Sequence, residues 1–589
     1  MRTLEIARFQ EELQPGLRDE NEELDHSRTS TCRKQGLSYF NIPGECPMLG
    51  MTVGDMIDFA ASKYEDAEAF VAPFQNVRRS FRQLQRDVDK FSGGLAALGL
   101  KFGDRIAIWS PNTYECYLTQ LAGWKAGLIV VCINAALQSR ELLYALNKVG
   151  VRCIVISKQF KNQDYYEILT KSIPEIKKSC YPGHLKSPHA PELEFVISVE
   201  RDLLGAIHFS DVLEIGDNNI LIPQNQESNK IQFDDVCTLF FTSGTTGSPK
   251  AVMLSHHNLV NNGYFVGRRL GLKIKDRICL SVPLFHVYGC QVGIFASMIH
   301  GVTTVIPSYG YDAKAIACIS ASERCTYITG TPTMFSDMLK AIDGVEIDFS
   351  NLKAVITGGA ICSPELVNDI RNRMPLSKVV SNYGMTEIGC TYMGLPNDSD
   401  FLASSTAGFP CENTEVKLVD KNGKIVPIGE EGELCVRGYG VTLGYYGEPE
   451  KTLEVLEQSR WFHTGDLFVM SVSGHGRVVG RIKEMVNRGG ENVYPKEVED
   501  FLKTHPKIVE AHVFGMPDQR MGEEPSVWIQ LHENEIMTPE EVKSFCKGQI
   551  AHFKIPKYIF FRDDFPRTPL GKVQKFRMRE ETLKILKKM

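Results

Sequence analysis

The chain has 589 residues, of which 43% are hydrophobic and 23% charged, and it carries a formal net charge of −6. A chain of this length exceeds a single hydrophobic core, so at least two domains are expected. The slight acidic excess leaves no broad cationic surface, which argues against a nucleic-acid-binding protein. Sixteen cysteines stand singly, without a Cys-x-x-Cys pair. This pattern fits a reducing compartment and argues against a disulfide framework or a structural zinc site.

Neither terminus shows a targeting signal. The first 30 residues carry eight acidic side chains against four arginines, whereas transit peptides are poor in acids and signal peptides need an apolar stretch. The terminal Lys587-Lys588-Met589 is not a peroxisomal signal. The longest stretch without Lys, Arg, Asp or Glu, residues 278–311, contains polar side chains and several glycines. It predicts a buried helix followed by a strand, rather than a membrane span.

Residues 104–157 alternate between strand-like and helix-like patterns. Such a β-α-β-α-β run builds a parallel sheet with helices on both faces. Gly150 suits the C-terminal end of the second helix. The predicted elements are strands at 105–109, 127–133 and 151–156, and helices at 112–125 and about 142–149.

Later segments indicate more sheets. Further apolar strands are predicted near 303–307, 325–329, 353–357 and 378–383, and residues 180–232 are read mostly as surface connection. Antiparallel hairpins follow around 416–419 and 433–436, with a turn at Asn422-Gly423. After a junction near 480–484, a last mixed unit begins. It includes strands at 509–514, 525–531 and 557–561, and a helix whose capping box starts at Thr538.

Residues 242–250 read Thr-Ser-Gly-Thr-Thr-Gly-Ser-Pro-Lys and lie between two apolar runs. Glycines allow backbone N–H groups to turn toward an anion, hydroxyls add donors, and Lys250 adds a positive charge. The segment therefore predicts a phosphate-binding loop. It differs from the Walker form, because Pro249-Lys250 stands where Gly-Lys-Ser/Thr would be required and a strand, not a helix, follows. A plain surface turn is the alternative.

Four more segments combine polar groups of the kind that bind nucleotides. They are Ser381-Asn-Tyr-Gly-Met-Thr-Glu387, Trp461-Phe-His-Thr-Gly-Asp466, Gly480-Arg481 followed by Arg488-Gly-Gly-Glu-Asn-Val-Tyr-Pro495, and Pro566-Arg-Thr-Pro-Leu-Gly-Lys572. Each is unremarkable alone.

In order and spacing, these five segments resemble the adenylate-forming superfamily of acyl-CoA synthetases, firefly-type luciferases and peptide-synthetase adenylation domains. The resemblance covers about residues 50–580. It is strongest to the mitochondrial medium-chain acyl-CoA synthetases of the family member 2 type, through Gly432–Gly438, Arg488–Pro495 and His552–Tyr558. One departure is Ala251, which stands where glycine commonly follows the phosphate-binding loop.

The resemblance implies an α/β fold. A large N-terminal domain of doubly wound sheets with a small β-barrel-like part would be followed by a small mobile α+β domain. The implied division is an N-terminal extension over 1–45, the large domain over 46–481, and the C-terminal domain over 482–589, hinged near Lys483.

The implied reaction has two steps. A carboxylate attacks the α-phosphorus of ATP and diphosphate leaves; coenzyme A then displaces AMP from the acyl-adenylate. Both steps concentrate negative charge, so positioned cations and hydrogen-bond donors should dominate catalysis. ATP and coenzyme A are the implied substrates, with a fatty acid, and Mg²⁺ is the implied metal.

The resemblance assigns roles residue by residue. Lys572 would bridge the carboxylate and the α-phosphate, Thr386 would donate to that phosphate, and Glu387 would bind Mg²⁺. Tyr383 would stack on adenine beside Asn382 and Gly384, while Asp466 accepts from both ribose hydroxyls with support from Arg481. The remaining assignments are the loop Thr242, Ser243, Gly244, Thr245, Thr246, Gly247, Ser248, Pro249 and Lys250, the pantetheine-lining Gly489 and Gly490, and His286 at the acyl end.

Each assignment has a structural alternative. Lys572 could be a solvated lysine in a basic tail, Asp466 a turn acid, Arg481 a surface ion pair, and His286 a core histidine. We interpret His286 as a gate or positioner, not a base, and His256-His257 as the start of a helix. Met334 and Phe335 could line an acyl pocket or belong to the core.

The sequence is compatible with three alternative functions: a luciferase-like oxygenase, another acid-adenylating enzyme, and a non-catalytic nucleotide-binding relative. A carrier-protein domain is not expected after Lys572, and neither nucleic acid nor a transmembrane segment is expected. The resemblance implies a mitochondrial location, with the cytoplasm as the alternative suggested by the acidic N-terminus.

Overall fold

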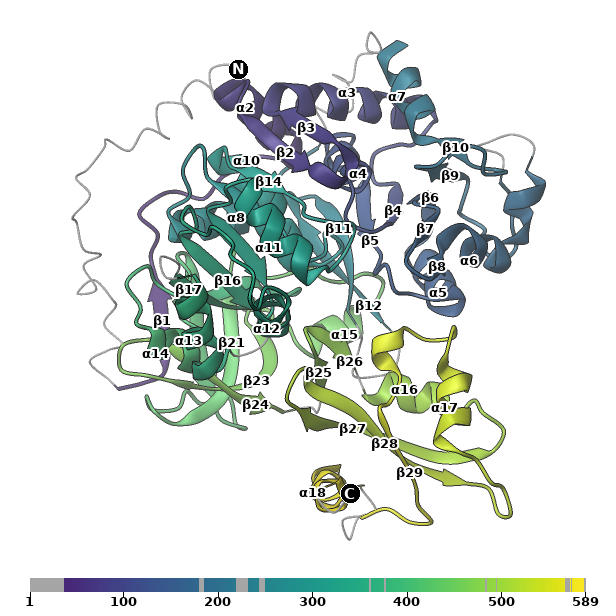
Figure 1. Ribbon diagram of the computed structural model, residues 1–589, viewed down its shortest axis with the longest axis vertical. Helices are drawn as coiled ribbons and strands as arrows, with labels where there is room; N and C mark the ends of the chain where they lie inside the picture. Colours follow the sequence, from purple (N-terminus) through teal and green to yellow (C-terminus); the bar gives the residue numbers. More distant parts are fainter. Residues whose placement is uncertain are drawn as a thin grey trace.

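The computed structural model describes residues 36–179, 185–218, 231–242, 249–359, 362–374, 378–482, 485–493, 495–566, 573 and 575–586. Two large sheets, one smaller antiparallel sheet and their helices form the N-terminal unit, up to residue 482. The rest of the described chain, residues 485–586, forms a C-terminal unit with its own sheet and core (Figure 1). Of the segments discussed above, 1–35, 243–248, Lys483 and Lys572 lie outside the described residues.

The first large sheet contains the predicted β-α-β-α-β run. Its strands are parallel from β10 to β11, and β12 and β22 are antiparallel additions. In sheet order they are β10 (Ile207–His208), β9 (Phe195–Ser198), β6 (Val151–Ile156), β4 (Arg105–Trp109), β5 (Ile129–Cys132), β11 (Val236–Thr242), β12 (Lys250–Ser255) and β22 (Gly444–Tyr445). The helices of the run are α4 (Tyr114–Lys125) and α5 (Ser139–Val149), and Gly150 ends α5 in the left-handed region, as predicted.

The interpretation of residues 180–232 as surface connection was wrong in part. Strand β9 pairs in parallel with β6 and is buried along its length. Helix α7 (Phe209–Asn218) packs on α3 (Phe81–Ala97), where the rings of Phe91 and Phe209 stack at 4.2 Å. The apolar run of β9, Phe195-Val-Ile197, is too short to give a periodic signal, so only its neighbours define it as a strand.

The second large sheet is parallel from β17 to β2, with antiparallel strands at both edges. Its order is β19 (Phe409–Pro410), β18 (Gly389–Met393), β17 (Lys378–Met385), β16 (Ala354–Gly358), β15 (Tyr327–Gly330), β13 (Arg277–Cys279), β14 (Thr303–Val305), β2 (Glu68–Ala72) and β3 (Val77–Ser80). Apolar residues from both large sheets and from the helices between them share one core cluster.

Further helices cover the sheets of the N-terminal unit. They are α2 (Val53–Tyr64), α6 (Tyr165–Ser172), α8 (His256–Leu270), α9 (Val287–Cys290), α10 (Ser297–His300), α11 (Ala313–Ser322), α12 (Pro332–Ala341), α13 (Pro364–Arg373), α14 (Asp400–Ser405) and α15 (Pro449–Leu453), with 3-10 turns η3 (Pro73–Gln75) and η4 (Pro174–Lys178) and a short hairpin, β7 (Gln159–Phe160) with β8 (Gln163–Asp164).

The uncharged stretch 278–311 contains helix followed by strand, as predicted. A π-helical segment, η7 (Gln291–Ala296), joins α9 to α10, and β14 follows. Within the described residues, no helix combines the length and the apolar run that crossing a bilayer requires. Helix α8 begins at His256, capped by Ser255, which confirms the interpretation of His256-His257 as a helix start.

The third sheet of the N-terminal unit is antiparallel and corresponds to the predicted barrel-like part. Its order is β1 (Tyr39–Ile42), β20 (Thr414–Val419), β21 (Glu431–Gly438), β23 (Phe462–Met470) and β24 (Gly476–Arg481). The C-terminal unit contains β25 (Val486–Arg488), β26 (Glu491–Val493), α16 (Pro495–Leu502), β27 (Ile508–Asp518), β28 (Gly522–Leu531), α17 (Pro539–Cys546), η8 (His552–Lys554), β29 (Tyr558–Phe561) and α18 (Lys575–Leu586). The capping box at Thr538 is present.

Candidate active site

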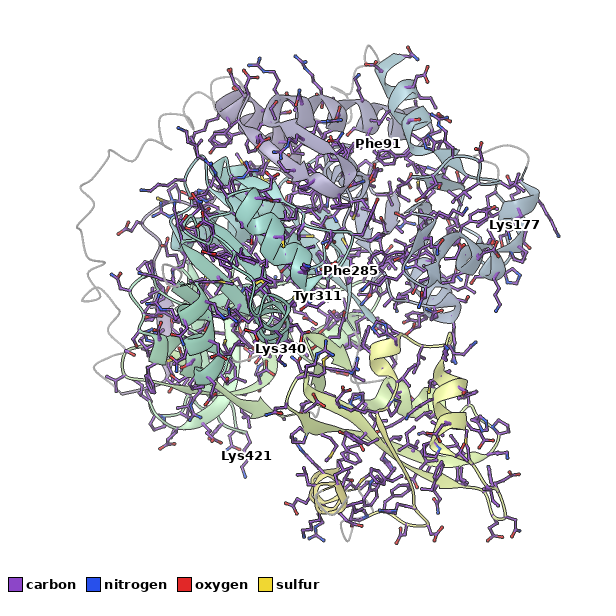
Figure 2. All side chains as sticks on the ribbon, viewed as in Figure 1. Phe91, Lys177, Phe285, Tyr311, Lys340 and Lys421 are labelled. Carbon is purple, nitrogen blue, oxygen red and sulfur yellow. The ribbon has the colours of Figure 1, made fainter. Side chains whose placement is uncertain are left out.

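A cavity of about 1150 Å³ lies where the N-terminal unit meets the C-terminal unit. Its lining includes most of the described residues that the sequence singled out: Thr242, Pro249, His286, Asn382, Tyr383, Gly384, Thr386, Glu387, Asp466, Gly489 and Gly490. Five segments that are far apart in the sequence therefore converge on one space. Figure 2 shows Phe285 and Tyr311, which also line it, near the middle of the molecule, whereas Lys177 and Lys421 project from its periphery.

The two ends of the predicted phosphate-binding loop lie side by side. Thr242 is the last residue of β11 and Lys250 the first of β12, and the two are opposite each other in this antiparallel pair. The Lys250 side chain is buried, with its ammonium 4.4 Å from the centroid of the Tyr445 ring. Burial lowers the pKa of Lys250, and the nearby Glu387 carboxylate opposes that shift. A buried cation therefore stands at the base of the loop.

Glu387 and Thr386 lie just beyond β17. Both are buried, and both line the cavity. The Glu387 Oε1 atom accepts hydrogen bonds from the Tyr445 hydroxyl at 3.2 Å and from the Thr242 hydroxyl at 3.5 Å. A carboxylate beside hydroxyl oxygens and next to a phosphate-binding loop is a donor set that suits Mg²⁺. The residues present therefore fit the metal that the resemblance implies.

Two of the groups assigned to adenosine are in direct contact. The Tyr383 hydroxyl donates to Asp466 Oδ2 at 2.7 Å, and Asp466 is 2% exposed. In the antiparallel pair of β23 with β24, Asp466 is directly opposite Arg481. Asn382 precedes Tyr383 on β17, and its side chain lies against Gly358 of the neighbouring strand. Asn382, Tyr383 and Asp466 line the cavity, and the strand pairing places Arg481 next to Asp466 in the sheet.

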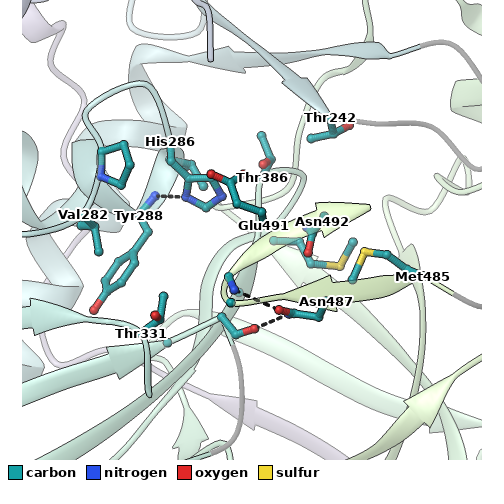
Figure 3. Close-up of a pocket in the computed structure, with 18 of the residues that line it drawn as sticks. Thr242, Val282, His286, Tyr288, Thr331, Thr386, Met485, Asn487, Glu491 and Asn492 are labelled. Atoms are coloured by element: carbon teal, nitrogen blue, oxygen red, sulfur yellow. Dashed lines mark hydrogen bonds between the residues drawn. The ribbon is translucent and has the colours of Figure 1, made fainter. Parts of the chain in front are cut away.

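Gly489 and Gly490 form the turn between β25 and β26, and they bring the C-terminal unit into the cavity. Figure 3 shows Asn487 and Glu491, on either side of this turn, among the residues that line the pocket. Both have positive φ angles, 58° and 92°. A Cβ atom on Gly490 would lie 2.8 Å from Thr331 Cγ2 of the N-terminal unit. The Asn487 side chain bridges the two units, because its Nδ2 donates to the Gly359 carbonyl at 2.6 Å and its Oδ1 accepts from Gly490 N at 3.1 Å. Glycine is required here by close approach as well as by conformation.

His286 caps the short helix α9, with its Nδ1 accepting from Tyr288 N at 3.2 Å. Its ring is accessible to the cavity yet deep within the molecule, and this burial lowers the pKa of His286 to about 4. The neutral ring at neutral pH fits a positioning group better than a base. Of the nearby pair, Met334 lines the cavity, while Phe335 is 1% exposed and belongs to the core.

Two polar connections between the units were not predicted from the sequence. The Lys554 ammonium contacts Glu141 of helix α5 at 2.8 Å and Glu497 of its own unit at 2.7 Å, and all three side chains are at most 12% exposed. Arg520 pairs with Asp337 at 2.8 Å in a solvent-exposed position. The only sequence signal for Lys554 was its place in the segment His552–Tyr558 that carries part of the resemblance.

Comparison with known proteins agrees with this geometry. The AMP-binding enzyme family matches residues 57–446, and its C-terminal domain family matches residues 497–572. The chain is 42% identical to "Medium-chain acyl-CoA ligase ACSF2, mitochondrial" of Mus musculus, over 94% of this chain and 91% of the relative. It is 36% identical to "Putative acyl-CoA synthetase YngI" of Bacillus subtilis, over 91% of this chain and 98% of that protein.

Solved structures share the fold. Mycobacterium tuberculosis fatty acyl CoA synthetase superposes with a TM-score of 0.64 at 25% identity, covering 90% of this chain and 98% of that one. The o-succinylbenzoate CoA synthetase of Bacillus subtilis superposes with a TM-score of 0.74 at 23% identity, covering 90% and 99%. Family matches over both units, together with relatives that extend over nearly the whole chain, establish the relationship: the chain belongs to the AMP-binding enzyme family.

Proposed function

We propose that this chain is an ATP-dependent, AMP-forming fatty acid–CoA ligase that acts on medium-chain acids. The observation that carries the proposal is the single cavity in which the predicted nucleotide-binding groups, an apolar region and the Gly489-Gly490 turn meet. The family match and the names of the relatives, which are medium-chain acyl-CoA ligases, support the same activity. The word mitochondrial in those names supports that location for this chain as well.

The nucleotide fits the polar end of the cavity. Asp466 would accept from the ribose hydroxyls, Tyr383 would stack on adenine next to Asn382 and Gly384, and Arg481 would support the sugar. The 2.7 Å bond between Tyr383 and Asp466 supports this arrangement, because base and ribose are adjacent in any nucleotide. Thr386 would donate to the α-phosphate, and the loop 242–250 would hold the other phosphates.

Mg²⁺ would neutralise the phosphate charge when bound. Glu387 is the residue we assign to it, because its carboxylate is buried beside Thr242 and Tyr445 at the end of the phosphate-binding loop. The Glu387 carboxylate also faces the buried Lys250 cation, which would balance its charge in the absence of a metal.

The acyl group fits the apolar end of the cavity, where Val282, Phe285, Val287 and Met334 contribute to the lining. His286 lies at this end, neutral and capped onto its helix. We assign it the position next to the reacting carboxylate, as a gate or positioner. Burial of successive methylene groups against these side chains would stabilise binding by about 0.8 kcal/mol each until the pocket is filled.

The observed arrangement of the units fits the second half-reaction. Gly489 and Gly490 are in the cavity, where a thin pantetheine arm must pass close to backbone. For the first half-reaction, the C-terminal unit would rotate about a hinge at Lys483 and bring Lys572 to the α-phosphate. Domain rotation of this kind lets one cavity present different groups to successive steps.

A panel of straight-chain acids from acetate to palmitate, with benzoate as an aromatic control, tests the substrate assignment. Diphosphate release would be measured with and without coenzyme A. We expect the highest kcat/KM at intermediate chain lengths and a requirement for coenzyme A only in the thioester step. A clear preference for acetate, an aromatic acid or palmitate would contradict the medium-chain assignment, whatever the adenylating activity.

A further inference from the structure

A charged cluster lies on the third sheet of the N-terminal unit, outside the lining of the cavity. The His463 ring stands between two carboxylates: its Nδ1 is 3.0 Å from Glu433 Oε2, and its Nε2 is 2.8 Å from Glu457 Oε1. Cys435 Sγ is 3.5 Å from the same Nδ1, because Cys435 and His463 are directly opposite in the pairing of β21 with β23. None of these four side chains contributes to the cavity lining.

The contacts favour the charged form of the ring. Hydrogen bonds to Cys435 and to Glu433 raise the pKa of His463 to about 11, against the effect of its partial burial. A protonated imidazole has two N–H donors and can bond both carboxylates at once, whereas the neutral ring could donate to only one. Hydrogen bonds between charged partners are also stronger than neutral ones.

The cluster connects to the cavity through the second oxygen of Glu433. Glu433 Oε1 accepts from the backbone N–H of Gly465 at 3.0 Å. Gly465 has a φ angle of 71° and directly precedes Asp466, which lines the cavity. On the other side of Gly465, the Thr464 hydroxyl accepts from Asp466 N at 3.1 Å and donates to the Leu434 carbonyl at 2.8 Å. The irregular stretch of β23 that presents Asp466 is therefore bonded to β21 at two points.

We propose that His463 is a positioning residue for the nucleotide. His463 lies between Glu457 and Glu433 and holds the Glu433 carboxylate on the Gly465 N–H, and this contact orients Asp466 toward the ribose. His463 does not contact the ligand itself. The inference rests on the proposed function, which assigns the ribose hydroxyls to Asp466. It adds a chain of charge-assisted contacts behind that carboxylate, from Glu457 through His463 and Glu433 to the Gly465 N–H of β23.

Nucleotide selectivity provides the test. kcat/KM would be measured for ATP and for 2′-deoxy-ATP by diphosphate release, at a saturating concentration of one fatty acid. We expect His463→Gln to lower kcat/KM for ATP by about tenfold, mainly through KM, and that for 2′-deoxy-ATP by less than about threefold. The selectivity for the ribose therefore falls. His463→Arg keeps a positive charge with several donors, so it is expected to retain most of the selectivity for ATP over 2′-deoxy-ATP.

Matched variants separate positioning from folding. His475→Gln is the control, because His475 is a buried histidine that bonds to Asp398 at 2.9 Å at the edge of the same sheet. His475→Gln is expected to change kcat/KM for ATP and for 2′-deoxy-ATP by the same factor. Glu457→Gln removes the outer carboxylate charge, which is partly exposed, and is expected to shift selectivity in the same direction as His463→Gln but by less. Thermal unfolding of each variant shows whether it is folded.

Each remaining outcome contradicts the proposal in a distinguishable way. If His463→Gln lowers kcat/KM for ATP and for 2′-deoxy-ATP by the same factor, the residue is only structural. If Asp466→Asn leaves the selectivity intact, the ribose assignment is wrong and the positioning role with it. The donor atoms of Glu433, Cys435 and His463 also lie within 4.8 Å of one another, a spacing that could hold a metal ion. Selectivity lost on treatment with a zinc chelator, and restored by zinc in excess Mg²⁺, would assign the cluster to a metal and overturn the proposal.

Discussion

Replacing Lys572 by alanine is expected to lower the rate of acyl-adenylate formation by at least about a hundredfold. Thioester formation from supplied acyl-AMP should stay within about threefold of the original rate. The first step brings a carboxylate onto a phosphate, so two negative groups must approach each other. An ammonium group placed between them is worth most in the transition state, where charge on the phosphate oxygens is greatest. The second step starts from the acyl-adenylate, a mixed anhydride in which the carboxyl group is already bonded to the phosphate, so it does not need that bridge.

Two separate assays measure this difference. Adenylation is measured as diphosphate release in the absence of coenzyme A. The second step is measured as thioester formation from synthetic acyl-AMP and coenzyme A. Lys584→Ala is the control, because Lys584 is an exposed lysine in helix α18, which ends the described chain. Equal loss of both half-reactions in Lys572→Ala would show that the residue supports the fold of the tail and does not act in adenylation.

Replacing Lys554 by methionine is expected to have the opposite effect: thioester formation falls by about tenfold to a hundredfold, and adenylation is unchanged or slightly faster. Lys554 joins the units through its contact with Glu141, and it is 4% exposed. Burial opposes the charge of Lys554, but Glu497 and Glu141 outweigh that effect and raise its pKa. Removing one partner of a buried ion pair costs about 3–5 kcal/mol, because it leaves the other charge uncompensated.

That cost applies only to the arrangement in which the three side chains are buried together. Methionine leaves Glu141 and Glu497 facing each other without a cation, so the observed docking is disfavoured relative to any arrangement that exposes them. Even half of the usual cost changes such an equilibrium by about tenfold or more. The half-reaction that uses the docked Gly489-Gly490 turn should therefore lose rate.

Arg520→Ala is the control for this variant. Arg520 also pairs across the units, with Asp337, but it is 61% exposed. Exposed ion pairs contribute about 0–1 kcal/mol, so the effect on either half-reaction should remain below about fivefold. A Lys554→Met enzyme with an unchanged thioester step, or with both steps reduced alike, would show that the buried contact does not select the observed arrangement.

The residues of the candidate site could be predicted from the sequence because local segments determine them. Each segment assigned to the nucleotide is a short motif in or beside a strand, so a short run of residues specifies both the chemistry and the backbone that presents it. Asp466 and Arg481 illustrate this: they occur in separate motifs, and the hairpin of β23 and β24 places them opposite each other. The β-α-β-α-β run over 104–157 was predictable for the same reason, since its apolar periodicity is local.

The contacts between the units could not be predicted in this way. Lys554 and Glu141 are 413 positions apart, and nothing near either residue indicates the other. The same holds for the hydrogen bond between Glu433 and Gly465 N, which depends on the register of β21 with β23. Strand β9 was missed because its burial comes from a neighbouring strand and not from its own pattern. Long-range packing, rather than local propensity, determines these features.

Transfer of AMP from ATP to the carboxylate of a fatty acid is the reaction we propose for the described cavity. It can be measured as exchange of labelled diphosphate into ATP, with Mg²⁺ and a series of fatty acids but without coenzyme A. We expect exchange that depends on the fatty acid and is greatest for intermediate chain lengths. No exchange with any acid of the series, in folded protein that binds ATP, would contradict it.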